Sequence, residues 1–383
     1  MIKLFEMFSG YGGASFGLKK ANIDFECIGI SEIDKYAIQL YNQNFSDIKN
    51  FGDCTKINPN ELPDFDLLTG GFPCQDVSVI GNRDLSKGRT ILFDEIIRIA
   101  EIKKPTYMLL ENVKGLLSSP FYEHCKKELK RIGYHSIIGF LNSKDYGIPQ
   151  NRPRVWFVCK LGEWKFNEFQ FPQKEELKIV LKDIIEKNPD KIYILSDNMK
   201  KYPHKIEPKI SPCLLASGVI YRLTSVATIK TNKEPSFKGN RIIPSDKKYF
   251  STLITNKNQN DKLSEKTRDL DKAIKVAQDL SIENNTPIQL DTYHLQKGEI
   301  RPLSTYIPQD FNVHRCLLVG KPKEVLIENG QIRYLTPREC FRLMGFLNDE
   351  IKLEGLTDTQ KYKLAGNGWD INLVSKIFKR MFK

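Results

Sequence analysis

The sequence lacks the closely spaced cysteines and histidines that most structural metal sites require. None of its eight cysteines forms a Cys-x-x-Cys pair, and only five histidines accompany them. Tetrahedral zinc sites combine such ligands at short spacing, so we expect no structural zinc. The cysteines are Cys27, Cys54, Cys74, Cys125, Cys159, Cys213, Cys316 and Cys340. In a reducing compartment they are free thiols, and most are expected to be buried and unreactive.

The sequence also has no apolar run long enough to cross a membrane, which takes about 18 consecutive residues. Its N-terminus enters a strand-like pattern at Ile2 and lacks the charged start, long apolar stretch and cleavage site of a signal peptide. These absences predict a cytoplasmic protein with no membrane contact.

The composition instead offers positive charge and enough chain for two domains. With 383 residues, the chain exceeds one compact core and fits two domains of roughly 100–200 residues each. The net charge of +12 suits a polyanionic partner, because released counterions drive binding to nucleic acid. Composition alone leaves open a basic, soluble protein with no such partner.

Residues 1–160 alternate between short apolar strands and helical segments. This alternation predicts an α/β fold with a mostly parallel sheet and helices on both faces. Ligands of such sheets bind at the carboxyl ends of the strands. The expected strands are Ile2–Phe8, Glu26–Ser31, Asp66–Gly70, Tyr107–Glu111 and Val155–Lys160, and the expected helices are Lys35–Asn44, Leu92–Ile102 and Tyr122–Ile132, with an amphipathic stretch ending at Ala21.

At about residue 165, Lys, Asn and Pro become more frequent and the periodicity weakens. This change divides the chain into two predicted domains. The first comprises residues 1–165 and is completed by 350–383, where a final helix is expected at Asn372–Phe382. The second, at 166–349, is smaller and mostly irregular or β. Within it, residues 200–260 hold twelve Lys or Arg against three acidic residues, a local net charge of +9. Leu263–Leu280 has the apolar spacing of one amphipathic helix.

A glycine-rich loop, FSGYGG at residues 8–13, follows the first strand. Glycines let the backbone turn sharply and approach a ligand. Glu32 ends the second strand, where an acid can bind ribose hydroxyls, and Asp53 closes the next segment. The pattern differs from the Gly-x-Gly-x-x-Gly that holds pyrophosphate, so it suits a nucleoside without phosphates, such as S-adenosylmethionine. For this loop alone, a nicotinamide site or a purely structural turn stays open.

A second loop, GGFPCQDVS at residues 70–78, directly follows a predicted buried strand. Two glycines and a proline make the loop tight and rigid, so it can present the thiol of Cys74 to a cleft. Residues 78–89 are polar, with Gly81 and Gly88 as candidate hinges, and predict a lid over the substrate. A single cysteine in such a loop is more often buried filler, so this motif needs support from others.

This second loop resembles the catalytic loop of the cytosine-5 DNA methyltransferase family. The resemblance continues in order, and at sensible spacing, through most of the chain outside residues 165–332, which leaves little room for accident. The other similar segments are the glycine loop at 8–13, ENV at 111–113, QNRPRV at 150–155, RYLTPREC at 333–340 and GN at 366–367.

The resemblance implies a Rossmann-like, S-adenosylmethionine-dependent methyltransferase domain and a second target-recognition domain at 166–349. It implies transfer of a methyl group to carbon 5 of cytosine within a specific sequence of double-stranded DNA, after the base has been flipped out of the duplex. It further implies a bacterial enzyme that acts as a monomer in a restriction-modification system, with a restriction endonuclease as a functional partner.

The resemblance also implies roles for single residues in catalysis. Cys74 would add to carbon 6 of the ring and so make carbon 5 nucleophilic. Glu111 would share a proton with ring nitrogen 3. Arg154 would contact the flipped base near its oxygen, and Arg152 would help near the catalytic loop and the backbone. Further contacts with substrate or DNA are expected from Gln75, Ser78, Asn112 and Gln150.

For the cofactor, the resemblance implies that Phe8 stacks on adenine and that Gly10 and Gly12 back the methionine part. Glu32 would bind the ribose, and Asp53 would lie near the adenine amine. Further cofactor contacts are expected from Ile33, Cys54, Leu92 and Asn367.

Four residues depart from the family pattern. Gly368 and Trp369 stand where most members have a serine and an apolar residue, which leaves the local cofactor contact open but does not affect the fold. Val77 and Pro153 replace a common phenylalanine and a common glutamate. None of these departures is at a residue assigned to catalysis.

Three rival hypotheses remain at this point: a tRNA cytosine-5 methyltransferase, a catalytically inactive DNA-binding module and a nicotinamide dehydrogenase. The long segment at about 165–332 argues for DNA over tRNA. A dehydrogenase would explain the glycine loop but would give no joint role to Cys74, Glu111 and Arg154.

Overall fold

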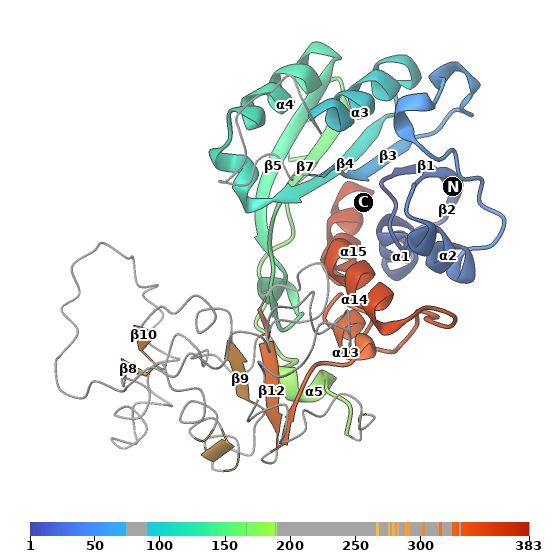
Figure 1. The fold of residues 1–383 in the computed structure, drawn as a ribbon. Coiled ribbons are helices and arrows are strands. Elements are labelled where there is room, and N and C mark those ends of the chain that lie inside the picture. Colours follow the sequence, from blue (N-terminus) through green and yellow to red (C-terminus); the bar gives the residue numbers. More distant parts are fainter. Residues whose placement is uncertain are drawn as a thin grey trace. The chain divides into compact units, whose positions relative to one another are not determined.

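The computed structural model divides the chain into two compact units (Figure 1). Unit 1 comprises Met1–Ile179, Arg315–Val319 and Cys340–Lys383, and unit 2 comprises Val180–His314 and Gly320–Glu339. The structure describes residues 1–73, 90–165, 167–187, 189 and 331–382, with short pieces at 266–267, 275, 278–279, 282, 288–291, 301–302, 314–315 and 324–328.

Unit 1 is built on a six-stranded sheet with the strand order β2-β1-β3-β4-β7-β5. β1 runs parallel to β2 and β3, β3 runs parallel to β4, and β7 is antiparallel to both β4 and β5. The strands are β1 (Ile2–Met7), β2 (Phe25–Ser31), β3 (Leu67–Gly71), β4 (Tyr107–Val113), β5 (Tyr134–Asn142) and β7 (Pro153–Leu161), with a short β6 (Gln150–Asn151) before β7. The four parallel strands therefore end along one common edge.

Helices cover both faces of this sheet (Figure 1). The helices of the chain are α1 (Gly13–Ala21), α2 (Lys35–Asn44), α3 (Thr90–Lys103), α4 (Pro120–Arg131), α5 (Leu181–Ile184), α13 (Pro337–Arg342), α14 (Asp358–Asn367) and α15 (Ile371–Met381), and the 3-10 turns are η1 (Cys54–Lys56), η2 (Pro59–Glu61), η3 (Lys114–Ser118) and η4 (Ser143–Tyr146). α3 and α4 share one core with the sheet, whereas α1 and α15 share the other.

The strands alternate between these two cores, as the pleat of a sheet requires. On β1, Phe5 points to the core of α3 and α4, and its neighbour Leu4 points to the core of α1 and α15. Leu68 and Leu67 divide in the same way on β3. Because both faces are buried, these strands appear in the sequence as short continuous apolar runs.

Polar side chains start the helices by accepting hydrogen bonds from free backbone N–H groups. Asp34 accepts from Tyr36 N at 2.9 Å before α2, and Asp370 accepts from Asn372 N at 2.9 Å before α15. Ser119 does the same for α4, whose first residue is Pro120, a position where the missing N–H costs nothing.

The strand and helix predictions for the first 165 residues are confirmed within a few residues at each end. This holds for β1, β2, β3, β4 and β7, and for α2, α3 and α4; the predicted C-terminal helix corresponds to α15. The sequence analysis did not include β5 or α14.

In unit 2, the described strands form two small antiparallel sheets. They are β8 (Lys266–Thr267), β9 (Ile288–Asp291), β10 (Arg301–Pro302), β12 (Glu324–Glu328) and β13 (Gln331–Arg333), with β11 (His314–Arg315) at the division between the units. β12 pairs with β9 and β13, and β8 pairs with β10. The single helix expected at Leu263–Leu280 is therefore wrong at its start, where strand pairing prevails over the amphipathic pattern; most of its other residues, and residues 200–260, lie outside those described.

A buried ion pair joins Arg333 and Glu339 in unit 2. Arg333 is 2% exposed, and its Nη1 and Nη2 donate to the carboxylate of Glu339 at 2.9 and 2.8 Å. The same carboxylate accepts from the backbone N–H groups of Thr336 and Glu186. Two guanidinium nitrogens and two backbone N–H groups thus converge on one carboxylate, which holds the pair in a single geometry.

The compact units divide at 179/180 and 339/340, whereas the sequence analysis predicted boundaries at 165/166 and 349/350. The difference has a packing reason. Phe169 and Phe171 pack into the core of α1 and α15, and Phe341 and Phe346 pack against Tyr11. The role of the second unit in target recognition stays a prediction.

Of the described helices, none is long and apolar enough to cross a bilayer. The described residues also contain no cluster of three or more His, Cys, Asp or Glu side chains suited to a metal ion.

α1 and α15 approach so closely that residue 17 has no room for a side chain. A Cβ added to Gly17 would lie 2.5 Å from Cγ1 of Val374 and 3.2 Å from Cε2 of Phe378. We therefore expect Gly17→Ala to lower the free energy of unfolding by about 1–3 kcal/mol, because the overpacking outweighs the better helix propensity of alanine. Urea denaturation measures this change.

Lys19→Ala, at an exposed position of the same helix, is the matched control and should change stability by less than about 0.5 kcal/mol. A Gly17→Ala variant as stable as the wild type would contradict the close packing.

Candidate active site

A cavity of about 600 Å³ opens where the parallel strands end. Its wall comes from the ends of β1 to β4, the start of β7 and the end of α14. The predicted site residues that line it are Phe8, Gly10, Glu32, Ile33, Asp53, Cys54, Leu92, Glu111, Asn112, Arg152, Arg154 and Asn367. The residues expected to hold a cofactor and those expected to act on a base thus share one cavity.

The glycine loop enters this cavity in a strained conformation. Phe8 has a φ of 53°, which non-glycine residues rarely adopt, and its N–H donates to the carbonyl of Ser31 at 2.8 Å. Gly10 has a φ of 55°. Positive φ values at two such close positions turn the chain sharply beside the cavity, and strain of this kind is typical of ligand sites.

The carboxylate of Glu32 joins the glycine loop to the end of β2. Its Oε2 accepts from Gly10 N at 2.9 Å, and its Oε1 accepts from the N–H groups of Ile33 and Asp34 at 2.8 and 2.9 Å. The side chain is therefore fixed where the cavity begins. Oε2, which has a single backbone donor, keeps a further lone pair with which to accept from a ligand hydroxyl.

Asp53 and Cys54 lie at the start of the turn η1, beside the same cavity. Asp53 accepts from the backbone and the hydroxyl of Thr55, and these hydrogen bonds lower the pKa of its exposed carboxyl. Burial raises the pKa of the Cys54 thiol to about 11. Arg98 holds the turn by donating to the carbonyl of Cys54 at 3.0 Å.

Burial also keeps other described thiols protonated. It raises the pKa of Cys27 and of Cys159 to about 12. Cys125 and Cys340 are buried as well. Cys27, Cys54 and Cys159 are thus not thiolates at neutral pH, as expected for structural thiols.

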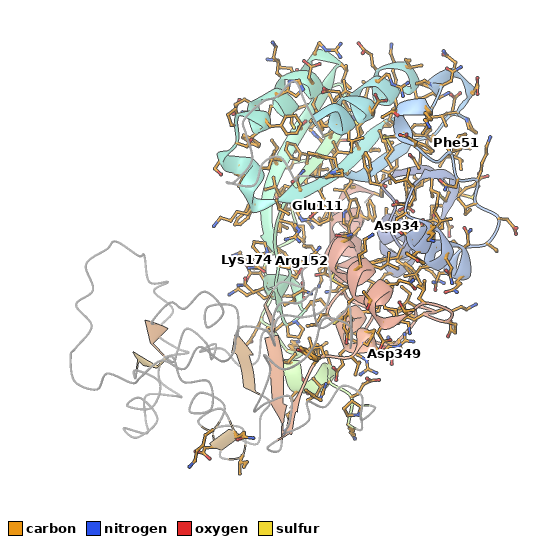
Figure 2. All side chains as sticks on the ribbon, in the orientation of Figure 1. Asp34, Phe51, Glu111, Arg152, Lys174 and Asp349 are labelled. Atoms are coloured by element: carbon orange, nitrogen blue, oxygen red, sulfur yellow. The ribbon has the colours of Figure 1, made fainter. Side chains whose placement is uncertain are left out.

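Glu111 and Arg154 form an ion pair inside the cavity. Oε1 of Glu111 lies 2.7 Å from Nε of Arg154, and both side chains are 12% exposed. They come from neighbouring antiparallel strands, β4 and β7, and Figure 2 marks Glu111 at the end of its strand. Oε2 of Glu111 lies 3.2 Å from the position that a Cβ would take on Gly71, so the carboxyl faces the end of β3.

Asn112 ties the segment before the cysteine loop to β4. Its Nδ2 donates to the carbonyl of Phe72 at 3.1 Å, and its Oδ1 accepts from Val113 N at 2.8 Å. The side chain is 2% exposed. It therefore fixes the chain two residues before Cys74, which itself lies outside the described residues, as do Gln75 and Ser78.

Arg152 and Gln150 connect this region to the C-terminal part of unit 1. Nη2 of Arg152 donates to the carbonyls of Gly366 and Gly368 at 3.2 and 2.7 Å, and Figure 2 labels this residue. The amide of Gln150 donates to the carbonyl of Leu343. Gln150 has no exposed surface, and its expected contact with DNA stays a prediction.

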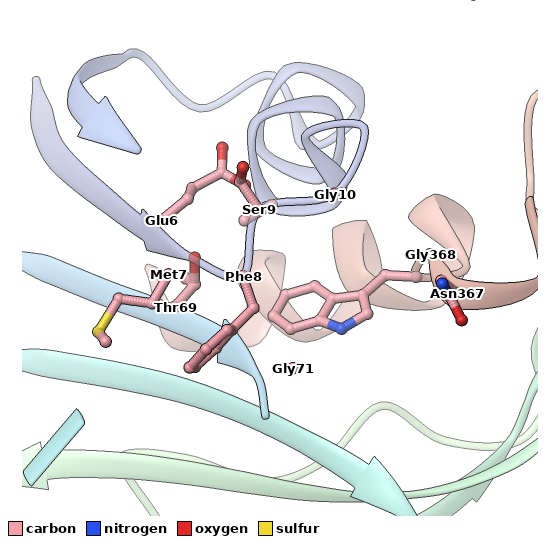
Figure 3. A pocket seen from close by; sticks show the side chains of 13 residues that line it. Glu6, Met7, Phe8, Ser9, Gly10, Thr69, Gly71, Asn367 and Gly368 are labelled. Carbon is pink, nitrogen blue, oxygen red and sulfur yellow. The ribbon is translucent and has the colours of Figure 1, made fainter. Parts of the chain in front are cut away.

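A narrow notch of about 30 Å³ adjoins the cavity (Figure 3). It is lined by the end of β1 with the glycine loop, by the end of β3 and by the end of α14. The two spaces share Phe8, Gly10, Gly71 and Asn367. Glu6, Trp369 and other residues complete the notch. No ligand contact was predicted from the sequence for Glu6, Gly71 or Trp369. Of these three residues, only Trp369 had a signal in the sequence, because it departs from the family pattern.

Glu6 is a buried acid behind the glycine loop. It accepts from the hydroxyl and the N–H of Ser15 and from the hydroxyl of Tyr41 at 3.2 Å. These neutral donors offset only part of the loss of water. Burial therefore raises the pKa of Glu6 to about 7.

The model of the C-5 cytosine-specific DNA methylases matches residues 2–383. The chain belongs to this family. As a member, it is a DNA methyltransferase that acts on carbon 5 of cytosine.

Two relatives of this DNA methylase match it along nearly its whole length, and a third matches about half of it. An orphan methyltransferase of Bacillus phage SPR is 27% identical over 99% of this chain and 97% of its own. A type II methyltransferase of Lactococcus lactis subsp. cremoris is 26% identical over 100% of this chain and 99% of its own. M.HhaI of Haemophilus parahaemolyticus, also type II, is 36% identical over 48% of this chain and 57% of its own.

Solved structures share the fold. The S. pombe Dnmt2 methyltransferase has a TM-score of 0.62 and 19% identity, covering 100% of this chain and 98% of its own. A putative DNA modification methyltransferase encoded within a prophage of E. coli has a TM-score of 0.57 and 19% identity, covering 100% and 99%. These likenesses support the Rossmann-like arrangement of the sheet.

One residue assigned to the cofactor does not line the cavity of this DNA methylase. Gly12 begins α1 with a φ of 90°, and a Cβ there would lie 2.9 Å from the rings of Tyr41 and Phe45. Its lack of a side chain serves the packing of α1 on α2. The other cofactor assignments stay predictions, with their side chains at the cavity.

The raised pKa of Glu6 predicts a pH-dependent stability. Between pH 4.5 and about 7, the native acid keeps a proton that the unfolded chain has lost, so the free energy of unfolding falls as the pH rises through this window. The whole effect amounts to about 3 kcal/mol. Glu6→Gln, which keeps an acceptor for Ser15, should flatten this pH dependence in urea denaturation between pH 5 and 8.

Glu123→Gln on α4 is the control for Glu6→Gln, since Glu123 is exposed and pairs with Lys126 at 3.1 Å. It should leave the slope unchanged. An unaltered slope in Glu6→Gln would show that Glu6 is not the responsible group.

Proposed function

We propose that this DNA methyltransferase transfers the methyl group of S-adenosylmethionine to cytosine in a specific sequence of double-stranded DNA, after flipping the base into the cavity. Cys74 is the nucleophile. The observation that carries the proposal is the Glu111–Arg154 ion pair, which lies in a cavity shared with the strained glycine loop and faces the strand that leads to the Cys74 loop.

The chemistry requires a temporary bond between the protein and the base. The thiolate of Cys74 adds to carbon 6 of cytosine, which turns carbon 5 into a nucleophile. Carbon 5 then takes the methyl group, loses its proton to a base, and the bond between sulfur and carbon 6 breaks. Glu111 holds a proton at ring nitrogen 3 during the addition, and Arg154 holds the Glu111 carboxylate and contacts the base near its oxygen.

The cavity fits the methyl donor. Oε2 of Glu32 has a free lone pair for a ribose hydroxyl, and Phe8 offers a ring to the adenine. The donor carries no phosphates, so it needs no glycine-rich phosphate-binding loop. When bound, S-adenosylmethionine supplies a methyl group on a cationic sulfur. Asp53 and Ile33 line the same cavity, and the Asp53 carboxylate would accept a hydrogen bond from the adenine amine.

We further propose that unit 2 is the target-recognition domain and that its basic residues 200–260 contact the phosphate backbone. The type II relatives support a place in a restriction-modification system beside a separate endonuclease, and the phage relative is an orphan. We also propose that the enzyme is bacterial and cytoplasmic, acting as a monomer.

Methylation mapping tests this function directly. Unmodified duplex DNA and tRNA are each incubated with the protein and S-adenosylmethionine, and 5-methylcytosine is located by sequencing. Methylation at one recurring motif in duplex DNA is the expected result. Methylation of tRNA alone, or of neither substrate, would overturn the proposal.

Cys74 should form a covalent adduct with duplex DNA that carries 5-fluorocytosine at the mapped target site. Fluorine at carbon 5 cannot leave as the proton does, so the bond between sulfur and carbon 6 persists after methyl transfer. The wild type should give a shifted band on a denaturing gel, and Cys74→Ser should give none. Cys125→Ala, which changes a cysteine buried in the core, should still form the adduct.

Glu111→Gln should lower the rate of methyl transfer by about 10²–10⁴-fold, since a neutral amide cannot share a proton with the ring. Affinity for S-adenosylmethionine should stay within about two-fold. Single-turnover kinetics and calorimetry give the two numbers. An equal loss of cofactor affinity would point to a structural role of the ion pair, and Glu123→Gln serves as the control for both measurements.

A further inference from the structure

The notch contains a residue to which the proposed function gives no task. Trp369 is 8% exposed and lines the notch together with Phe8 and Gly71. The family pattern has an apolar residue at this position. A large aromatic ring here changes both the shape and the electrostatics of the space beside the cavity.

The backbone that carries this indole is fixed from three sides. The hydroxyl of Tyr11 donates to the carbonyl of Trp369, and Nη2 of Arg152 donates to the carbonyl of Gly368 at 2.7 Å. A Cβ on Gly368 would lie 1.9 Å from the ring of Tyr11, so glycine at 368 and tyrosine at 11 require each other. The indole also packs edge-to-face on Trp156, with ring centroids 5.1 Å apart.

The indole lies close to Glu111, the residue that the proposed function assigns to the reacting base. Its Nε1 lies 2.8 Å from the position of a Cβ on Gly71, and Oε2 of Glu111 lies 3.2 Å from the same point. The indole and the carboxyl of the ion pair therefore meet at the end of β3. A group that bridges the cavity and the notch must pass along this ring.

The surroundings of the notch favour a positive charge. Among the described residues that line it there is no lysine, arginine or histidine, whereas the rings of Phe8 and Trp369 are present. The two arginines of the adjoining cavity are engaged, Arg154 with Glu111 and Arg152 with backbone carbonyls. The face of an aromatic ring attracts a cation, most strongly in tryptophan.

We propose that Trp369 is a specificity determinant that distinguishes the positively charged sulfonium of S-adenosylmethionine from the neutral thioether of its product, S-adenosylhomocysteine. This inference rests on the proposed function. The ring stabilises the cationic sulfonium of the donor more than the neutral thioether of the product. Product therefore competes less well for the cavity after each turnover.

The test compares the affinities for both compounds in Trp369→Leu and Trp369→Phe by calorimetry. Trp369→Leu should weaken the binding of S-adenosylmethionine by roughly 3- to 30-fold and that of S-adenosylhomocysteine by less than about 2-fold. Trp369→Phe, which keeps a ring, should fall between the wild type and the leucine variant. Trp164→Leu is the matched control, because Trp164 packs on Tyr107 and Phe169 away from the cavity.

Equal weakening of both compounds, or no change in either, overturns the inference. If Trp369→Leu does not fold, as judged by thermal unfolding, Trp369→Phe and Trp369→Met are compared instead. The phenylalanine variant, which keeps a ring, must then prefer S-adenosylmethionine over S-adenosylhomocysteine more strongly than the methionine variant does. If the wild type binds neither compound, the proposed function itself fails. If the wild type binds the donor and methylates DNA but the variants keep its preference, only the role of Trp369 fails.

Discussion

The guanidinium of Arg152 holds the C-terminal segment of unit 1 against the sheet, and the cavity depends on this contact. Its hydrogen bonds end on the carbonyls of Gly366 and Gly368, where α14 stops and its last carbonyls lose their helical partners. A buried carbonyl left without a donor costs about 1–3 kcal/mol. One arginine between β6 and β7 therefore determines where Asn367 and Trp369 stand, although more than 200 residues separate them in the chain.

Three glutamates lie at the cavity and the adjoining notch, each in a different environment. Glu32 accepts three backbone N–H groups, which hold its carboxylate in a fixed place. Glu111 faces an arginine at 2.7 Å. Glu6 has only neutral donors, so burial dominates and its pKa rises. Glutamate thus serves three tasks in three environments. Glu32 has a positioning role, Glu111 takes part in the proposed reaction, and Glu6 supports the glycine loop.

Much of unit 1 could be predicted from the sequence because its strands are short apolar runs bounded by glycines and its helices have clear caps. β5 was missed because it is an edge strand in which buried and half-exposed residues mix, and Gly139 interrupts it. The helix at Leu263–Leu280 was wrong at its start because residues 266–267 pair with β10, which no local pattern shows.

The candidate site was predicted better than the contacts that hold it. Glu111 and Arg154 were both assigned to the flipped base from their motifs, and the structure brings them together in an ion pair. The burial of Gln150 and the packing of Gly12 on α2 follow from contacts with Leu343 and Tyr41, which only the folded chain brings together. The same is true of the pair of Tyr11 and Gly368, whose residues are separated by most of the chain.

This pair explains how a departure from the family pattern can leave the fold intact. The ring of Tyr11 occupies the space that a side chain at 368 would need, and its hydroxyl donates to the next carbonyl. A serine restored at 368 alone would therefore collide with the ring, and a smaller residue at 11 alone would leave a gap and lose a buried donor. Because either single change is costly, Tyr11 and Gly368 act as one unit, and the position of the Trp369 indole follows from both.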